Sequence, residues 1–552
     1  MDCRVPLRST RNEGCQPIKP LDRTCVLETM NSTQQLQHLY WRAGFGPRPQ
    51  DVAAGLSPRK ALRQLLHDSE KYEPLVGSSL NYSDPQGMVM TDPASTKNNP
   101  VPNGMVTTPD QPAPPGAPVA PVAPMRPRAA FKGGTVAAGV PRLRRADLTP
   151  EQRKMQNEGI RDAFNNMSTA WMERMATSPA QLREKMTLFW HGHFACRVRQ
   201  PDAALRLHNT TRQYALGKFP DLLLAVSKEP AMLQFLNNQQ NKKEHPNENF
   251  AREVMELFTL GRGNYTENDV KEGARAFTGW AYDYQGNFKF REREHDAGSK
   301  TFLGRTGNFT GEDVLTIILE QPATATFLTT KIYRFFVNDA PNPAHIEPLA
   351  REFRKSGYDI ADLLERMFSA DWFYDPANVG THIKSPVELL AGIRRTLNVK
   401  VDNAQPLLGY QRALGQNLFQ PPNVAGWPGG RNWIDSSSLL LRLQLPAILF
   451  KNAEFAVALK QDENDIAPNQ TKAERTVRPG AGAHLPLAPL QQLLGATPAP
   501  QQPEKLSGFL LQTAIRPENL QLVQQAAQQK EPAEALRSTL VSLLSLPEYQ
   551  LA

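Results

Sequence analysis

The stretch SPAQLREKMTLFWHGHF, residues 178–194, carries the pattern that decides the fold. Ser178, followed three positions later by Gln181, has the form of a capping box, in which two side chains satisfy free N–H groups at the start of a helix. Four residues then recur at spacings of four, three and four: Leu182, Met186, Phe189 and His193. This spacing places them on one helical face. The stretch therefore predicts an amphipathic helix with a buried apolar side.

The same signals occur on both sides of this stretch. Thr149 precedes Pro150, which is typical of a helix start, and NENFAREVMELFTLG, residues 247–261, offers Asn247 as the next N-cap. Thr266 and Asp269 form another capping box. The exception is AYDYQGNFKF, residues 281–290, in which aromatic residues alternate around a Gly-Asn turn, as in a β-hairpin. We expect a mainly α, multi-helical single core with one small β-hairpin near residues 282–290.

Composition divides the chain further. Residues 82–139 are rich in proline, glycine and small side chains, which bury too little apolar area to offset the entropy cost of ordering. We therefore expect long disordered Pro-rich insertions in the helical core. We expect six parts. They are a disordered or mis-assigned N-terminal extension (1–32), the first helical part of the core (33–76), a disordered Pro-rich insertion (77–146), the main helical core (147–455), a polar linker or loop (456–505) and a C-terminal helical tail (506–552). The true start is Met1 or Met30.

Charge and cysteine content exclude several classes of protein. With 63 basic and 55 acidic residues, the net charge of +8 is small for 552 residues, and no dense basic stripe predicts nucleic-acid binding. The 4 cysteines are too unevenly placed for a disulfide framework. No segment approaches the roughly 18 apolar residues of a membrane span, and residues 1–29 lack the apolar core of a signal peptide. These features favour the cytoplasm, with export on a partner as the alternative.

The two histidines of WHGHF raise the question of a metal site. His191 and His193 lie two positions apart, so an intact helix directs them to different sides. They can share one ion only if Gly192 breaks the helix and lets the imidazoles converge. Otherwise they are packed histidines at a helix end.

A second polar group lies on the predicted helix of residues 247–261. Asn249, Glu253 and Glu256 line one edge of its apolar face. Two carboxylates one turn apart at a half-buried edge repel unless cations or hydrogen-bond donors compensate them. The pattern fits an acid/base or metal site, with Arg252 nearby, and equally an ion-pair network.

Two further places have polar or aromatic residues of interest. His295 and Asp296 are adjacent at the end of the predicted hairpin, where they either join a site or stabilise a loop. Trp427 and Trp433 lie in a loop rich in proline and glycine, where they either offer a stacking platform or fill the core.

Several motifs occur together in a characteristic order: WRAGFGPRP, FWHGHF, PNENFARE, ELFTLG, GNYTENDV, ARAFTGW, HDAGSKTFLG, IKSPVELL and LGQNLFQPPNVAGWPGG. In the order and content of these motifs, over residues 35–445, the chain resembles a bacterial family catalogued as domain of unknown function 1800. The resemblance implies a large helical protein, frequently exported and encoded beside a sulfatase-like protein. It does not supply a reaction.

Two hypotheses follow. The first is a hydrolase-like or metal-assisted enzyme, with a divalent metal, acting on an extracytoplasmic polymer such as a polysaccharide. The second is a non-catalytic helical scaffold that works with a sulfatase-like secreted partner. In the first hypothesis the catalytic residues are Glu253, Glu256, His193, His295 and Asp296. The binding residues are Asn249, Arg252 and Trp427. The metal ligands are His191 and His193. We expect at least two of these histidines to lie within reach of Glu253 or Glu256.

Overall fold

The computed structural model describes residues 30–77, 149–451 and 482–552, with the backbone of four short strand segments between them. These residues are mainly α-helical, as the sequence predicts. The α-helices are α1 (Ser32–Ala43), α2 (Pro49–Ala53), α3 (Pro58–Asp68), α4 (Pro150–Thr177), α5 (Gln181–His193), α6 (Pro201–Gln213), α7 (Phe219–Ser227), α8 (Pro230–Phe235), α9 (Asn249–Glu253), α10 (Glu267–Ala276), α11 (Gly311–Glu320), α12 (Pro322–Phe336), α13 (Pro343–Lys355), α14 (Ile360–Ser369), α15 (Pro386–Thr396), α16 (Gln405–Leu414), α17 (Ser436–Lys451), α18 (Ala488–Leu494), α19 (Gln502–Leu510), α20 (Pro517–Ala527) and α21 (Pro532–Leu544).

The strands of the described residues pair only in twos, all antiparallel. The pairs are β1 (Ser79–Leu80) with β2 (Met90–Thr91), β3 (Trp280–Tyr282) with β4 (Phe288–Phe290), β5 (Lys300–Phe302) with β6 (Arg305–Gly307), β7 (Lys400–Val401) with β10 (Ala483–His484), and β8 (Phe455–Val457) with β9 (Arg475–Val477). The β3–β4 pair is the predicted hairpin, with Trp280 opposite Phe290. Gly286 takes a φ of +79° in its turn, a conformation that glycine adopts without strain.

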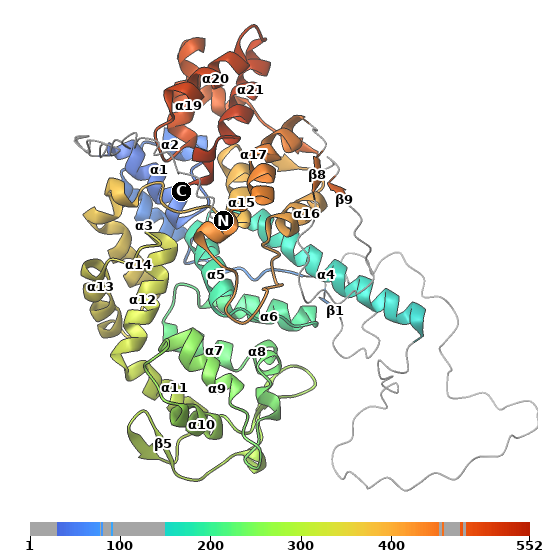
Figure 1. Ribbon diagram of the computed structural model, residues 1–552, viewed down its shortest axis with the longest axis vertical. Coiled ribbons are helices and arrows are strands. Elements are labelled where there is room, and N and C mark those ends of the chain that lie inside the picture. Colours follow the sequence, from blue (N-terminus) through green and yellow to red (C-terminus); the bar gives the residue numbers. More distant parts are fainter. Residues whose placement is uncertain are drawn as a thin grey trace, which may run out of the picture.

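Helix α5 lies at the centre of an elongated molecule (Figure 1). Helices α7 to α11 form one end of the molecule, α19 to α21 form the other end, and the long helix α4 projects to one side. Residues from both ends of the described chain belong to one continuous set of buried apolar contacts. The arrangement therefore has a single core, and α5 is the helix around which the other parts assemble.

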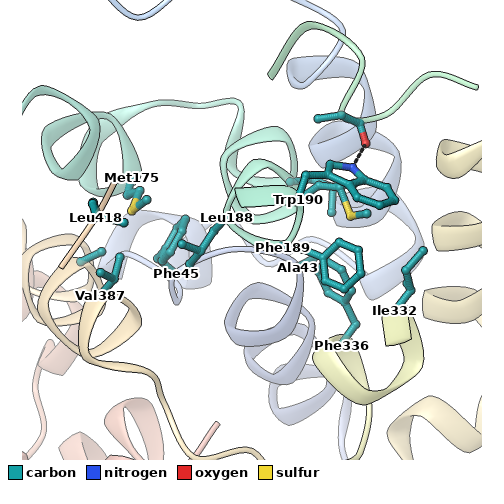
Figure 2. Close-up of a cluster of buried hydrophobic side chains, with 14 of the residues drawn as sticks. Ala43, Phe45, Met175, Leu188, Phe189, Trp190, Ile332, Phe336, Val387 and Leu418 are labelled. Carbon is teal, nitrogen blue, oxygen red and sulfur yellow. Dashed lines mark hydrogen bonds between the residues drawn. The ribbon is translucent and has the colours of Figure 1, made fainter. Parts of the chain in front are cut away.

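The apolar face predicted for α5 is buried, with Leu182 and Met186 fully covered. Figure 2 shows Phe189 and Trp190 of this helix among side chains from α1 and α12. The Trp190 indole also needs a hydrogen-bond acceptor in the interior, and its Nε1 donates to the Ala215 carbonyl at 3.1 Å. The spacing of apolar residues thus predicted the buried face correctly.

The predicted helix starts are only partly right. Thr149 and Thr266 cap α4 and α10 through capping boxes, as expected. Ser178 does not form the expected box, because α5 begins at Gln181 and Ser178 ends α4. The Ser178 hydroxyl instead accepts a hydrogen bond from Ala180 N, 3.1 Å away, within the tight connection between the two helices.

The end of the described chain pairs with the segment before α15. Ala552 N donates to the His382 carbonyl at 2.8 Å, and Ile383 lies opposite Leu551 in an antiparallel bridge. Helix α18 lies within residues 456–505, which we expected to be a polar linker. Its Leu490 and Leu494 are buried, so this part contributes to the core.

Other expectations concern residues that the structure does not describe. The N-terminal extension and the Pro-rich insertion, expected at 1–32 and 77–146, lie largely outside the described residues. Among the described helices, none has the length and apolar content required to cross a bilayer.

Candidate functional site

His193 closes the end of a neighbouring helix. Its Nε2 lies 3.1 Å from the Phe258 carbonyl oxygen, and because a carbonyl only accepts, Nε2 carries the proton. The side chain is buried, with the ring stacked on Phe189 at 5.8 Å between centroids. Burial, together with nearby Lys331, holds the pKa of His193 well below its usual range. His193 is therefore a neutral hydrogen-bond donor to the main chain.

The segment that His193 contacts is a π-helix, Val254–Thr259, which follows α9 directly. Leu260 N donates to the Met255 carbonyl at 2.8 Å, five residues back, in place of the usual four. A π-turn leaves carbonyls at its end for other donors, and Lys331 Nζ reaches the Leu257 carbonyl at 3.2 Å. Burial lowers the pKa of Lys331 to about 8.

The two acids predicted as a pair have different surroundings. The Glu256 carboxylate accepts hydrogen bonds from Arg262 Nε at 2.6 Å and from the Tyr265 hydroxyl at 3.0 Å. The bond from Arg262 lowers the pKa of Glu256. Glu253, by contrast, has no hydrogen bond or ion pair with another described residue, and partial burial together with Glu256 raises its pKa.

The two binding residues predicted beside this pair serve the local structure. Arg252 forms ion pairs with Glu267 at 2.7 Å and Glu248 at 3.2 Å, which joins α9 to α10. Asn249 Nδ2 donates to the Leu236 carbonyl at 3.3 Å. The expected N-cap, Asn247, lies one residue further out than the N-cap Glu248, and its side chain accepts from Asn249 N.

His295 and Asp296 stabilise a loop. His295 Nδ1 lies 3.0 Å from the Thr278 carbonyl, and Asp296 N donates to the Thr278 hydroxyl at 2.8 Å. The Asp296 carboxylate binds Arg275 at 2.7 Å, which lowers the pKa of Asp296. Buried Lys300 donates to the Asp296 carbonyl at 2.6 Å. These contacts favour the second of the two interpretations offered by the sequence.

His191 belongs to a different neighbourhood from His193. Its Nε2 accepts a hydrogen bond from Phe419 N at 3.0 Å, so the neutral ring carries its proton on Nδ1. The half-buried Trp427 lies 5.3 Å from His191 between ring centroids. The structure thus brings two predicted site residues, His191 and Trp427, into contact. Burial lowers the pKa of His191 to about 3.

Gly426 lets the loop that carries Trp427 approach α5 closely. Gly426, with a φ of +82°, packs so tightly on α5 that an added Cβ would lie 2.4 Å from the Gly192 carbonyl oxygen. Gly192 itself lies within α5, which continues to His193. Because Gly192 does not break the helix, the two histidines point to different neighbours.

A small cavity of about 10 Å³ lies beside His191, lined also by His208, Cys196 and Phe419. His208 is buried, and neither of its ring nitrogens has a hydrogen-bond partner among the described residues. Burial holds the pKa of His208 well below its usual range and raises that of the Cys196 thiol. The cavity is at the lower limit for one water molecule. The sequence offered no signal for His208, which lies outside the motifs.

The sequence motifs also gave no indication of a buried ionic cluster. The Glu388 carboxylate pairs with Lys185 and lies 3.1 Å from His382 Nε2. Burial opposes its charge, yet Lys185 and His382 hold the pKa of Glu388 well below its usual range. Next to it, Lys384 Nζ lies 3.6 Å from the centre of the Trp41 ring. The motif IKSPVELL contains Lys384 and Glu388 but gives no indication that Glu388 has a partner on α5.

The hydrogen bonds and ion pairs of the described residues do not connect the predicted site residues into one group. Among the described residues, no hydrogen bond or ion pair joins His191, His193 or His295 to Glu253 or Glu256. Nor does any group of three or more His, Cys, Asp or Glu side chains in this part of the chain stand ready to hold a metal ion. Most of the named side chains bind the main chain or neighbouring charges of the fold itself.

The fold and these contacts define a class: a large, mainly helical protein with one core, whose polar motifs connect distant helices. The chain belongs to the family of proteins of unknown function DUF1800, whose model matches residues 38–551. The match extends past the residues 35–445 over which the sequence motifs occur, and so includes α18 to α21. No curated protein and no solved structure matches the chain.

Proposed function

We propose that this chain is a non-catalytic helical scaffold that binds a second protein. The observation that carries the proposal is the bond from His193 to the Phe258 carbonyl, because His193, which the sequence offered both as a catalytic residue and as a metal ligand, is a buried cap on the main chain. A catalytic acid or base needs a substrate atom within reach and a pKa near the working pH. His193 has neither a solvent-exposed ring nor such a pKa.

The other polar motifs support the same interpretation. Arg252 joins α9 to α10, and Asp296 with Arg275 holds the loop after the hairpin. Hydrogen-bonded polar groups of this kind specify how helices meet. A rigid helical frame of this size has the large surface that a partner protein requires. The family resemblance suggests a sulfatase-like secreted protein as that partner.

One observation favours the competing hypothesis of a metal-assisted hydrolase. Glu253 is a half-buried carboxylate with a raised pKa and no described partner, and a raised pKa is a property of general acids. This hypothesis assigns the acid role to Glu253, and a polysaccharide would stack on Trp427. Glu253 is therefore the residue at which the two hypotheses differ.

The test uses the full chain and two substitutions. Metal content is measured by mass spectrometry on purified wild type and His191→Ala, and thermal unfolding is compared for wild type and Glu253→Gln. The scaffold proposal expects no stoichiometric metal that depends on His191, and a change in unfolding free energy below about 1 kcal/mol for Glu253→Gln. A stoichiometric divalent metal that His191→Ala removes would overturn the scaffold proposal.

A further inference from the structure

We infer that the groove between α12 and α13 binds a short acidic segment of a partner protein. The inference rests on the proposed function, and it names the surface and the chemistry of the contact. The two helices lie side by side on one flank of the molecule (Figure 1). The groove has a volume of about 560 Å³, within the range of roughly 300–1,000 Å³ that is usual for ligand pockets.

The shape of the groove follows from the spacing of its residues. On α13 the lining positions recur at helical spacing along one face: Glu347, Ala350, Arg351, Arg354 and Lys355. On α12 they are Pro322, Ala325 and Thr326 at the start of the helix. Ala325 and Ala350 are buried and small, so they form a shallow apolar floor. Such a floor admits an apolar side chain or the backbone of a peptide.

The charges on the groove are mainly positive. Arg351, Arg354 and Lys355 line it, and Glu347 is the single carboxylate in the lining. Arg351 is exposed and has no ion pair or hydrogen bond with another described residue. The Lys355 ammonium is 4.0 Å from Glu352, at the limit of an ion pair between exposed groups. Both cations are therefore available to carboxylates, and a guanidinium binds a carboxylate through two parallel bonds.

Arg354 contributes less to the binding of carboxylates than Arg351 and Lys355 do. Its Nη2 donates to the Glu320 carbonyl at 2.5 Å, which holds the guanidinium against the end of α11. An immobile side chain loses little conformational entropy when a ligand binds. Arg354 thus adds positive charge to the groove from a fixed position, while Arg351 and Lys355 make the contacts.

The flanking residues favour a peptide over a long polyanion. Glu320 and Glu352 are partly exposed and lie beside Arg354 and Lys355, where they also pair with Arg305 and Arg366. A nucleic acid or sulfated polysaccharide would extend past the groove toward these carboxylates, and like charges repel. A short peptide with alternating acidic and apolar residues places its carboxylates on Arg351 and Lys355 and its apolar side chains on the alanine floor.

The experiment measures fluorescence anisotropy of a short labelled peptide of alternating leucine and glutamate, titrated with the full chain. Arg351→Glu and Lys355→Glu are each expected to weaken binding by roughly tenfold, because they replace an attraction with a repulsion. Arg334→Glu is the matched control, since this exposed arginine lies on α12 but does not line the groove. It makes the same change in net charge and is expected to leave binding unchanged.

Several outcomes would overturn the inference. They are no binding of the peptide, equal loss of binding in Arg334→Glu, and stronger binding of a labelled oligonucleotide or sulfated oligosaccharide at the same residues. These outcomes are separate from the metal test at His191. If peptide binding does not depend on Arg351, the groove proposal fails and the scaffold proposal stands. If a bound metal depends on His191, the scaffold proposal fails, and peptide binding still tests the groove directly.

Discussion

Lys185 and Glu388, which are 203 positions apart in the chain, form an ion pair in the interior, with each side chain 4% exposed. Lys185 lies on α5 and Glu388 lies in the first turn of α15. Glu388 also accepts from Ser385 N at 2.8 Å, which completes the cap of α15. One carboxylate therefore connects the central helix to the start of a helix that is far away in sequence.

Removal of one member of this pair is predicted to destabilise the protein strongly. Lys185→Met removes the cation that is paired directly with the buried Glu388 carboxylate, and we expect a loss of about 3–5 kcal/mol in the free energy of unfolding. Urea denaturation provides the measurement. The double variant Lys185→Met with Glu388→Gln removes both charges and should be more stable than Lys185→Met alone. A double variant with the summed losses of both single variants would show that the two side chains do not interact.

Stability is predicted to fall as the pH drops from about 7 to about 5. The folded-state pKa of His208 is held well below 6.5 by burial, so below that pH the unfolded chain takes up a proton that the folded chain does not. The stabilising effect of the neutral ring is thus present above pH ~6.5 and lost below it, at about 1.4 kcal/mol per pH unit for each such histidine.

The variant His208→Phe checks this assignment. The ring of His208 packs on Trp171 at 4.3 Å between centroids, a setting that accepts another aromatic ring. Urea denaturation at several pH values should give a shallower pH dependence for His208→Phe than for wild type. Identical slopes would contradict a depressed pKa at His208.

The contact between Gly426 and Gly192 predicts opposite effects of two alanines. Gly426→Ala should cost about 1–3 kcal/mol, because its φ of +82° is strained for alanine and its Cβ would collide with the Gly192 carbonyl. Gly192→Ala has open space and a helical backbone, so we expect a gain of up to about 1 kcal/mol. Thermal unfolding measures both, with Gly429→Ala as a neutral control, since no atom lies within 4 Å of its added Cβ. Equal effects of the Gly426 and Gly429 substitutions would refute the close approach.

The cap at the end of the π-helix has its own test. His193→Phe keeps an aromatic ring beside Phe189 but leaves the Phe258 carbonyl without its donor, which should cost about 1–3 kcal/mol. Hydrogen exchange at Leu260 and Gly261, whose N–H groups both bind the Met255 carbonyl, should become faster. An unchanged exchange rate together with unchanged stability would mean that His193 only fills space.

Local sequence signals predicted much of the secondary structure. Thr149 and Thr266 marked their helix starts, and alternation around Gly286 marked the β3–β4 hairpin, because caps and turns depend on residues within a few positions. The failure at Ser178 shows the limit of the same rule. The sequence has the pattern of a capping box, but Ser178 is the C-cap of α4 and its hydroxyl binds Ala180 N in the short connection to α5.

The sequence by itself thus determined that the chain is mainly helical, which face of α5 is buried, and which polar residues the motifs of the chain contain. Only the tertiary structure decided that His193 caps Phe258, that His191 faces Phe419 and Trp427, and that Lys185 meets Glu388. The reason is physical: helix periodicity is set by backbone geometry over a few residues, whereas a polar side chain takes its role from the atoms that packing brings within about 3 Å of it, wherever these lie in the chain.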